Sequence, residues 1–201
     1  MRLLALIGAL AIVGALVAAG FFFGGFYDIS AAIQDPPALA SAIVRVRNAS
    51  IERHAADRAP ANFNDDSRLH DGARAFANAG CVNCHGAPGV KWAKFSEGLN
   101  PDPPDLKEVA GELDPSEIFW IVKNGIRMTG MPSFGAAGFG DDEIWSIAAF
   151  VKKIGGVSDA DFAAWTSPPA SPPPAAASPP QAPPAETPPP KPVAPGDTPK
   201  Q

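Results

Sequence analysis

The stretch Cys81-Val82-Asn83-Cys84-His85 determines how the rest of this chain is interpreted. It has the form Cys-x-x-Cys-His, in which two thiols each add to a vinyl group of one porphyrin and the histidine supplies a nitrogen to the iron. The chain has 2 cysteines, and both lie in this stretch. We therefore predict one covalent haem c, attached through Cys81 and Cys84, with His85 as an axial ligand of the iron.

Two other uses of a Cys-x-x-Cys pair fit the surrounding sequence less well. A thiol–disulfide redox pair needs a βαβ pattern around it, whereas this pair follows a stretch of helical character, residues 67–79. A zinc site needs two further ligands at suitable spacing. The other histidines, His54 and His70, do not form a second pair.

The residues around the motif predict an all-α domain over residues 67–165. A glycine that typically ends helices, Gly80, follows the first helical stretch. The string Asp114-Pro115-Ser116-Glu117 has the form of a capping box with proline in the first turn. Apolar residues recur at helical spacing between residues 141 and 154. Three helices are expected, over residues 67–79, 115–124 and 141–154. Residues 158–165 offer a final short turn, and the sequence leaves open whether Trp165 packs on the domain or is loose.

An apolar run from Leu3 to Phe23 precedes this domain and contains no charged residue. A helix of about 20 such residues crosses the hydrocarbon core of a membrane. A cleavable signal sequence is the alternative, with Val17-Ala18-Ala19 as the cleavage site. The run exceeds a signal sequence in length and continues through Phe21–Phe23, so we predict that residues 1–27 are a retained transmembrane anchor.

The segments on either side of the predicted domain differ from it in composition. Residues 28–66 are expected to be a connector with one helix, over 39–57, that packs loosely on the domain. The alternative is a helix that docks on the membrane surface or on a partner. Of the 24 prolines in the chain, 15 lie between Pro168 and Pro199. Such a sequence buries too little apolar surface to order itself, so residues 166–201 are predicted to be a disordered, partly polyproline II tail.

The charge of the chain argues against a nucleic-acid partner. The formal net charge is −5, whereas proteins that bind nucleic acid carry basic surfaces. Four basic residues flank the haem-binding strings and offer a local patch for steering an acidic partner. They are Lys91, Lys94, Lys123 and Arg127.

Several motifs together resemble class I c-type cytochromes, most closely the membrane-anchored bacterial monohaem type with a Gly-Met-Pro loop. They are Gly72 with Phe76 in the first helix, the Cys81–His85 string, Pro104-Asp105-Leu106, Gly130-Met131-Pro132-Ser133-Phe134, and Ala149-Phe150-Val151 in the last main helix. The resemblance implies the class I cytochrome c fold, with its first and last main helices crossing near Gly72 and Phe150.

The same resemblance implies roles for further residues. Met131, which precedes a proline, is the expected second axial ligand, and Met128 is the alternative. Methionine opposite histidine raises the potential of a haem. The carbonyl of Pro104, or of its neighbour Pro103, is expected to accept a hydrogen bond from His85, and Leu106 is expected to pack on the porphyrin. Further candidates for the haem pocket are Trp92, Phe95, Trp120, Ile121 and Phe134.

These observations predict a one-electron carrier rather than an enzyme, anchored in a bacterial cytoplasmic membrane by a single pass, with its haem domain in the periplasm. Its expected partners are redox donors and acceptors, such as a respiratory complex, an oxidase or a dehydrogenase. One alternative is a cytochrome c subunit of a membrane dehydrogenase or oxidase complex. Another is a haem-based ligand sensor, which would require loss of the methionine ligand.

Overall fold

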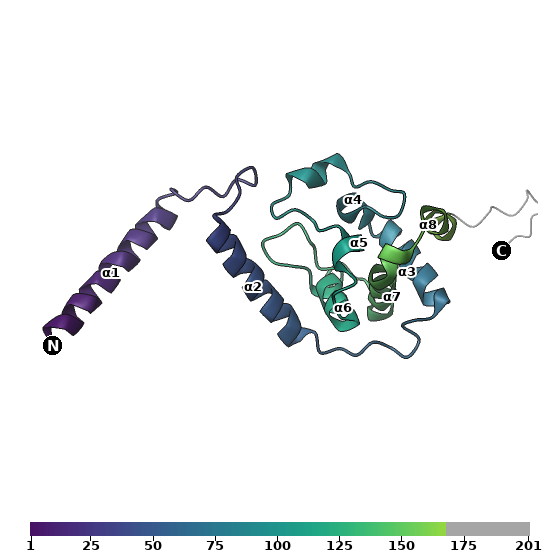
Figure 1. Cartoon of the computed structure of the whole chain (residues 1–201), viewed down its shortest axis with the longest axis horizontal. Coiled ribbons are helices and arrows are strands. Elements are labelled where there is room, and N and C mark those ends of the chain that lie inside the picture. Colours follow the sequence, from purple (N-terminus) through teal and green to yellow (C-terminus); the bar gives the residue numbers. More distant parts are fainter. Residues whose placement is uncertain (168–201) are drawn as a thin grey trace, which may run out of the picture. The chain divides into compact units, whose positions relative to one another are not determined.

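The computed structural model describes residues 1–167, all of whose regular elements are helical (Figure 1). The α-helices are α1 Arg2–Phe23, α2 Pro37–His54, α3 Asp66–Asn78, α4 Val82–His85, α5 Leu106–Val109, α6 Pro115–Asn124, α7 Asp141–Lys153 and α8 Asp159–Thr166. Two 3-10 helices are η1 Lys94–Gly98 and η2 Ile154–Gly156. The predicted all-α class is confirmed, and residues 168–201 of the predicted tail lie outside the described residues.

Helices α3 and α7 form the central contact of the domain (Figure 1). A Cβ atom on Gly72 would overlap the carbonyl oxygen of Ser146 and lie 2.9 Å from the Cβ of Phe150. The rings of Phe76 and Phe150 are 5.2 Å apart and both are buried. The two helices therefore approach closely because position 72 has no side chain.

A buried aromatic cluster joins α6 to α7. The rings of Phe119 and Trp145 stack with their centroids 4.1 Å apart, and Phe63 meets Trp145 edge to face at 5.9 Å. Phe63 lies in the predicted connector, yet only 5% of it is exposed. The connector therefore contributes a side chain to the hydrophobic core, which its sequence did not predict.

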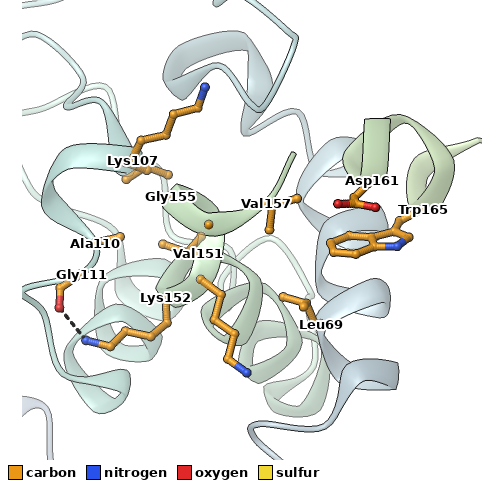
Figure 2. Close-up of a pocket in the computed structure, with 13 residues that line it drawn as sticks. Leu69, Lys107, Ala110, Gly111, Val151, Lys152, Gly155, Val157, Asp161 and Trp165 are labelled. Atoms are coloured by element: carbon orange, nitrogen blue, oxygen red, sulfur yellow. Dashed lines mark hydrogen bonds between the residues drawn. The ribbon is translucent and has the colours of Figure 1, made fainter. Parts of the chain in front are cut away.

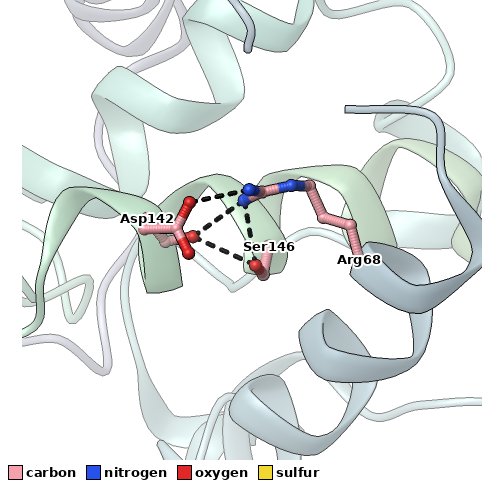
Figure 3. A network of polar contacts seen from close by, with 3 residues as sticks. All are labelled: Arg68, Asp142 and Ser146. Carbon is pink, nitrogen blue, oxygen red and sulfur yellow. Dashed lines mark hydrogen bonds and ion pairs between the residues drawn. The ribbon is translucent and has the colours of Figure 1, made fainter. Parts of the chain in front are cut away.

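A buried arginine also links α3 to α7 (Figure 3). The guanidinium of Arg68 donates to the carboxylate of Asp142 at 2.7 Å, to the backbone carbonyl of Asp142 at 3.0 Å, and to Ser146 Oγ at 3.1 Å. Its Nε atom is buried without a partner among the described residues. The network fixes the register of the two helices near the N-terminal end of α3. The haem motif follows the other end of that helix.

The N-terminal helix α1 has the length and apolar composition needed to cross a membrane, and none of its residues is buried in the structure. The following helix α2 is shorter than predicted at its C-terminal end, and one side of it contacts α6. Ile51 is 5% exposed, and the ring of His54 stacks on Trp120 at 5.9 Å. The connector is thus docked on the domain.

The C-terminal part of the domain follows the prediction closely. Helix α8 begins at a serine cap, where Ser158 Oγ accepts from the Asp161 amide at 3.1 Å. Phe162 is buried against Phe150. Trp165 packs against the core and lies 4.4 Å from the ring of His70, so it is held in place by the domain.

Candidate haem-binding site

The single turn α4 carries the two thiols and the histidine. The carbonyl oxygen of Cys81 accepts from the amides of Cys84 at 3.2 Å and His85 at 3.0 Å. Residues three and four positions apart on such a turn lie on one side of it. Gly86 then reverses the chain with a φ of 64°, which a residue with a side chain rarely adopts. The local fold thus presents Cys81, Cys84 and His85 together.

Both cysteines are free thiols and are half-buried. Burial raises the pKa of the Cys81 thiol to about 12, with a smaller contribution from the nearby Cys84. In the folded, haem-free chain this thiol is therefore protonated at neutral pH, whereas the thiolate is the reactive nucleophile. Attachment of a haem converts the sulfur to a thioether and removes this titration.

The Pro-rich loop before α5 orients the imidazole. His85 Nδ1 lies 3.0 Å from the carbonyl oxygen of Pro104. Asp105 caps the next turn by accepting from the Lys107 amide at 2.9 Å. A histidine that donates through one ring nitrogen presents the other to a metal, so Nε2 is the nitrogen of His85 available to iron.

The two candidate methionines occupy different environments within the loop between α6 and α7. Met131 is half-buried and packs against the core. Met128 is 88% exposed and has a φ of 60°, a left-handed conformation that is uncommon for a residue with a side chain. The geometry favours Met131 as the sulfur donor on the side of the protein interior.

A threonine that the sequence did not single out closes this loop. Thr129 Oγ1 donates to the carbonyl of Ile126 at 2.7 Å and accepts from the amide of Met131 at 3.1 Å. The amide of Ile126 donates to the carbonyl of Met131 at 3.2 Å. The sequence does contain a signal for this contact, which is a hydroxyl residue two positions before Met131. Serine and threonine side chains often form hydrogen bonds with nearby backbone groups in turns.

The other residues predicted for the haem pocket differ in how far they are exposed. Phe134 is 8% exposed and belongs to the core, whereas Trp92 and Phe95 are 47% and 63% exposed. Leu106 packs against the core but also lines a recess of about 470 Å³ between α5, η2 and α8. Figure 2 shows Trp165 and Asp161 on one side of this recess, and Lys152 bonding the carbonyl of Gly111 on the other side. Of the residues expected to contact haem or its iron, Leu106 lines this recess, whereas Cys81, Cys84, His85, Pro104 and Met131 do not.

The predicted basic patch is partly neutralised by acidic neighbours. Lys94 pairs with Glu97, and Lys123 lies 2.8 Å from the carboxylate of Asp141. Lys123 also lies 5.2 Å from the centre of the Phe119 ring. Among the described residues, the pairing leaves Lys91 and Arg127 as the members of the patch with no ion pair. Steering of an acidic partner therefore depends on fewer charges than the sequence suggested.

The residues present fit a covalently bound haem c. Two free thiols and an imidazole project from one turn, the imidazole is already oriented by a backbone acceptor, and a thioether packs against the same core as Cys81 and Leu106. Thioether sulfur and imidazole nitrogen are the ligand pair of electron-transfer haems. The side chains Trp92 and Phe95 supply exposed apolar surface beside the motif.

Comparison with known proteins supports this assignment. Residues 67–151 match the family model described as cytochrome C oxidase, cbb3-type, subunit III. The matched span runs from the first turn of α3 to the last turns of α7 and includes the Cys81–His85 string and Met131. No curated protein and no solved structure matches the chain.

Proposed function

We propose that this chain, whose residues 67–151 form a c-type cytochrome domain, holds its haem iron between His85 and Met131 and attaches the porphyrin through Cys81 and Cys84. The observation that carries the proposal is the pairing of an oriented imidazole with a half-buried thioether. Haem c, when bound, supplies a one-electron couple between ferric and ferrous iron.

Each of these residues has a separate task in electron transfer. His85 donates to Pro104 through Nδ1, which increases the basicity of its other nitrogen. Met131 supplies a soft sulfur donor, which favours the ferrous state and raises the potential. Thr129 holds the loop that presents Met131. If His85 and Met131 both hold the iron, a bound haem would exchange electrons and would offer no free position to oxygen or peroxide.

The cytochrome c domain and the apolar helix α1 make the chain a membrane-anchored haem c electron carrier. Its redox partners belong to respiratory or oxidase complexes. We place the haem domain in the periplasm, because α1 follows a single basic residue, Arg2, and basic residues remain on the cytoplasmic side of a membrane. Contact with a mobile redox partner is expected to be weak and transient.

A second candidate, a permanent subunit of an oxidase complex, is favoured by the description of the matching family. Gentle solubilisation of the native membrane separates the two. A carrier leaves the membrane as a small species, whereas a subunit co-migrates with a larger complex of constant composition.

The proposed role is tested by redox titration of the full-length haem protein in lipid nanodiscs. We expect a single transition that follows one-electron Nernst behaviour, and no change in the ferrous visible spectrum when carbon monoxide is added. A ferrous protein that binds carbon monoxide at once would have an open iron coordination position, which would contradict the carrier role.

A further inference from the structure

The helix α2 has an apolar stripe that stays partly exposed in the structure. Leu39, Ile43 and Val46 follow one another at spacings of four and three residues, so they lie on one side of the helix. They are 36%, 50% and 71% exposed. On the side that contacts the domain, His54, which stacks on Trp120, lies about 50° from the centre of the stripe, and the buried Ile51 lies about 110° from it.

Arginines border this stripe on both sides. Arg47 lies about 70° from the centre of the stripe, towards the side that contacts the domain, and Arg53 lies about 50° from it on the other side. Neither arginine forms an ion pair within residues 1–167. A helix whose apolar face is bordered by basic side chains matches the boundary between acyl chains and anionic headgroups.

The connection to α1 holds α2 close to the membrane. The hydroxyl of Tyr27 bonds the carboxylate of Asp35, which closes the loop between them. The backbone on either side of this bond has four Cα–Cα steps from Phe23 to Tyr27 and two from Asp35 to Pro37, which together span at most about 22 Å; the bonded side chains of Tyr27 and Asp35 add their own length to the connection. Tyr27 also packs on Phe21 and Phe22, an aromatic group typical of a membrane interface.

The opposite attachment of α2 is to the haem domain. His54 stacks on Trp120, Ile51 is buried, and the side chain of Asn100 donates to the carbonyl of Ile33 at 2.9 Å. The residue after Asn100 begins the Pro-rich loop that ends at Pro104, the acceptor of His85. The connector is therefore fastened to the domain at both ends of α2.

We propose that α2 lies on the surface of an anionic lipid bilayer through Leu39, Ile43 and Val46, and so fixes the haem domain at the membrane. The inference rests on α1 being the membrane anchor. A haem domain held in this way stays at a fixed short distance from the membrane surface, where it can transfer electrons to membrane-embedded partners. A domain on a flexible tether would vary in that distance. Arg47 and Arg53 provide the preference for anionic headgroups.

Spin labels in the full-length haem protein test this proposal in nanodiscs that contain phosphatidylglycerol. The native cysteines are occupied by haem, so a single label is attached to Ile43→Cys on the stripe or, as a control, to Asn48→Cys on the polar side of α2. We expect the ratio of accessibility to oxygen over a water-soluble nickel chelate to be severalfold higher at position 43. The ratio at position 43 is expected to fall in phosphatidylcholine discs and in the Arg47→Gln, Arg53→Gln variant.

A third label at Val13→Cys separates this proposal from its premise. If position 13 is in lipid while positions 43 and 48 are equally exposed to the nickel chelate, α1 anchors the protein and the α2 proposal is wrong. If position 13 is also in water, the anchor and the α2 proposal both fail. Protection of position 43 that persists in detergent and grows with protein concentration would assign the stripe to a second copy of the chain, and would overturn the lipid assignment.

Discussion

His85 Nδ1 lies 3.0 Å from the carbonyl oxygen of Pro104, nineteen residues further along the chain. This contact joins the turn that carries the thiols to the Pro-rich loop. It fixes the ring orientation and makes the other nitrogen a stronger donor. The sequence left Pro103 and Pro104 as alternatives, and the geometry places the Pro104 carbonyl at hydrogen-bonding distance.

Pro104→Ala tests the contribution of this contact to the potential. Alanine keeps the carbonyl but removes the ring that stiffens the loop, so the hydrogen bond weakens and the ferric state loses part of its stabilisation. We expect the midpoint potential to rise by about 20–40 mV, which corresponds to about 0.5–1 kcal/mol for a one-electron couple.

Pro103→Ala is the matched control, because its carbonyl is not the acceptor. It is expected to leave the potential nearly unchanged. Equal shifts in the two variants would show that general loosening of the loop, and not the bond to His85, controls the potential.

Gly72→Ala tests the crossing of α3 and α7. The added methyl group would overlap the carbonyl oxygen of Ser146, and such overpacking costs about 1–3 kcal/mol. We expect that loss in the free energy of unfolding, measured with guanidinium on the haem protein.

Gly98→Ala serves as its control. A Cβ at this position would meet nothing within 4 Å, and a surface substitution of this kind changes stability by less than about 0.5 kcal/mol. If both glycine variants unfold at the same denaturant concentration as the parent, close approach of the two helices does not depend on Gly72.

The buried Arg68 network leads to a prediction about charge and packing. Arg68→Ala leaves a cavity between α3 and α7 and is expected to cost about 2–3 kcal/mol. Its partners tolerate the loss, because Asp142 is 86% exposed and Ser146 Oγ still donates to the Asp142 carbonyl at 3.0 Å.

Arg68→Met separates the contribution of packing from that of the guanidinium hydrogen bonds. Methionine keeps the apolar stem and removes the Nε atom that is buried without a partner. The Asp142 carboxylate is 86% exposed, so the substitution leaves no buried charge without a partner. We expect it to unfold within about 1 kcal/mol of the parent. Equal damage from Met and Ala would instead assign the stabilisation to the hydrogen bonds of the guanidinium.

The domain's helices were predictable because their signals are local. Asp114 and Glu117 define the start of α6, where the Asp114 amide donates to the Glu117 carboxylate at 2.8 Å. The acidic and basic ends of α7 lie where the helix begins and ends, as the helix dipole favours. Such signals involve neighbouring residues and need no knowledge of the fold.

The missed features depend on contacts between distant residues. Phe63 and Trp145 meet across 82 positions of the sequence (145 − 63), and Arg68 reaches Asp142 across 74. From sequence alone, a phenylalanine in a polar connector or an arginine in a first helical turn is expected to be exposed. Only the packing of the helices shows that Phe63 and Arg68 are buried. The short turns α4 and α5 were missed because four residues give too little periodicity to detect.

The identity of the second axial ligand stays a prediction, and it is the central claim of the proposed function. Met131→Ala removes a half-buried thioether, whereas Met128→Ala removes one that is 88% exposed and serves as the matched control. The most direct measurement is the visible spectrum of the oxidised full-length haem protein, in which histidine–methionine ligation is expected to give a weak band at about 695 nm. We predict that the parent and Met128→Ala show this band and that Met131→Ala lacks it. A band that survives in Met131→Ala, or is absent from the parent, would contradict the assignment of Met131 as the ligand.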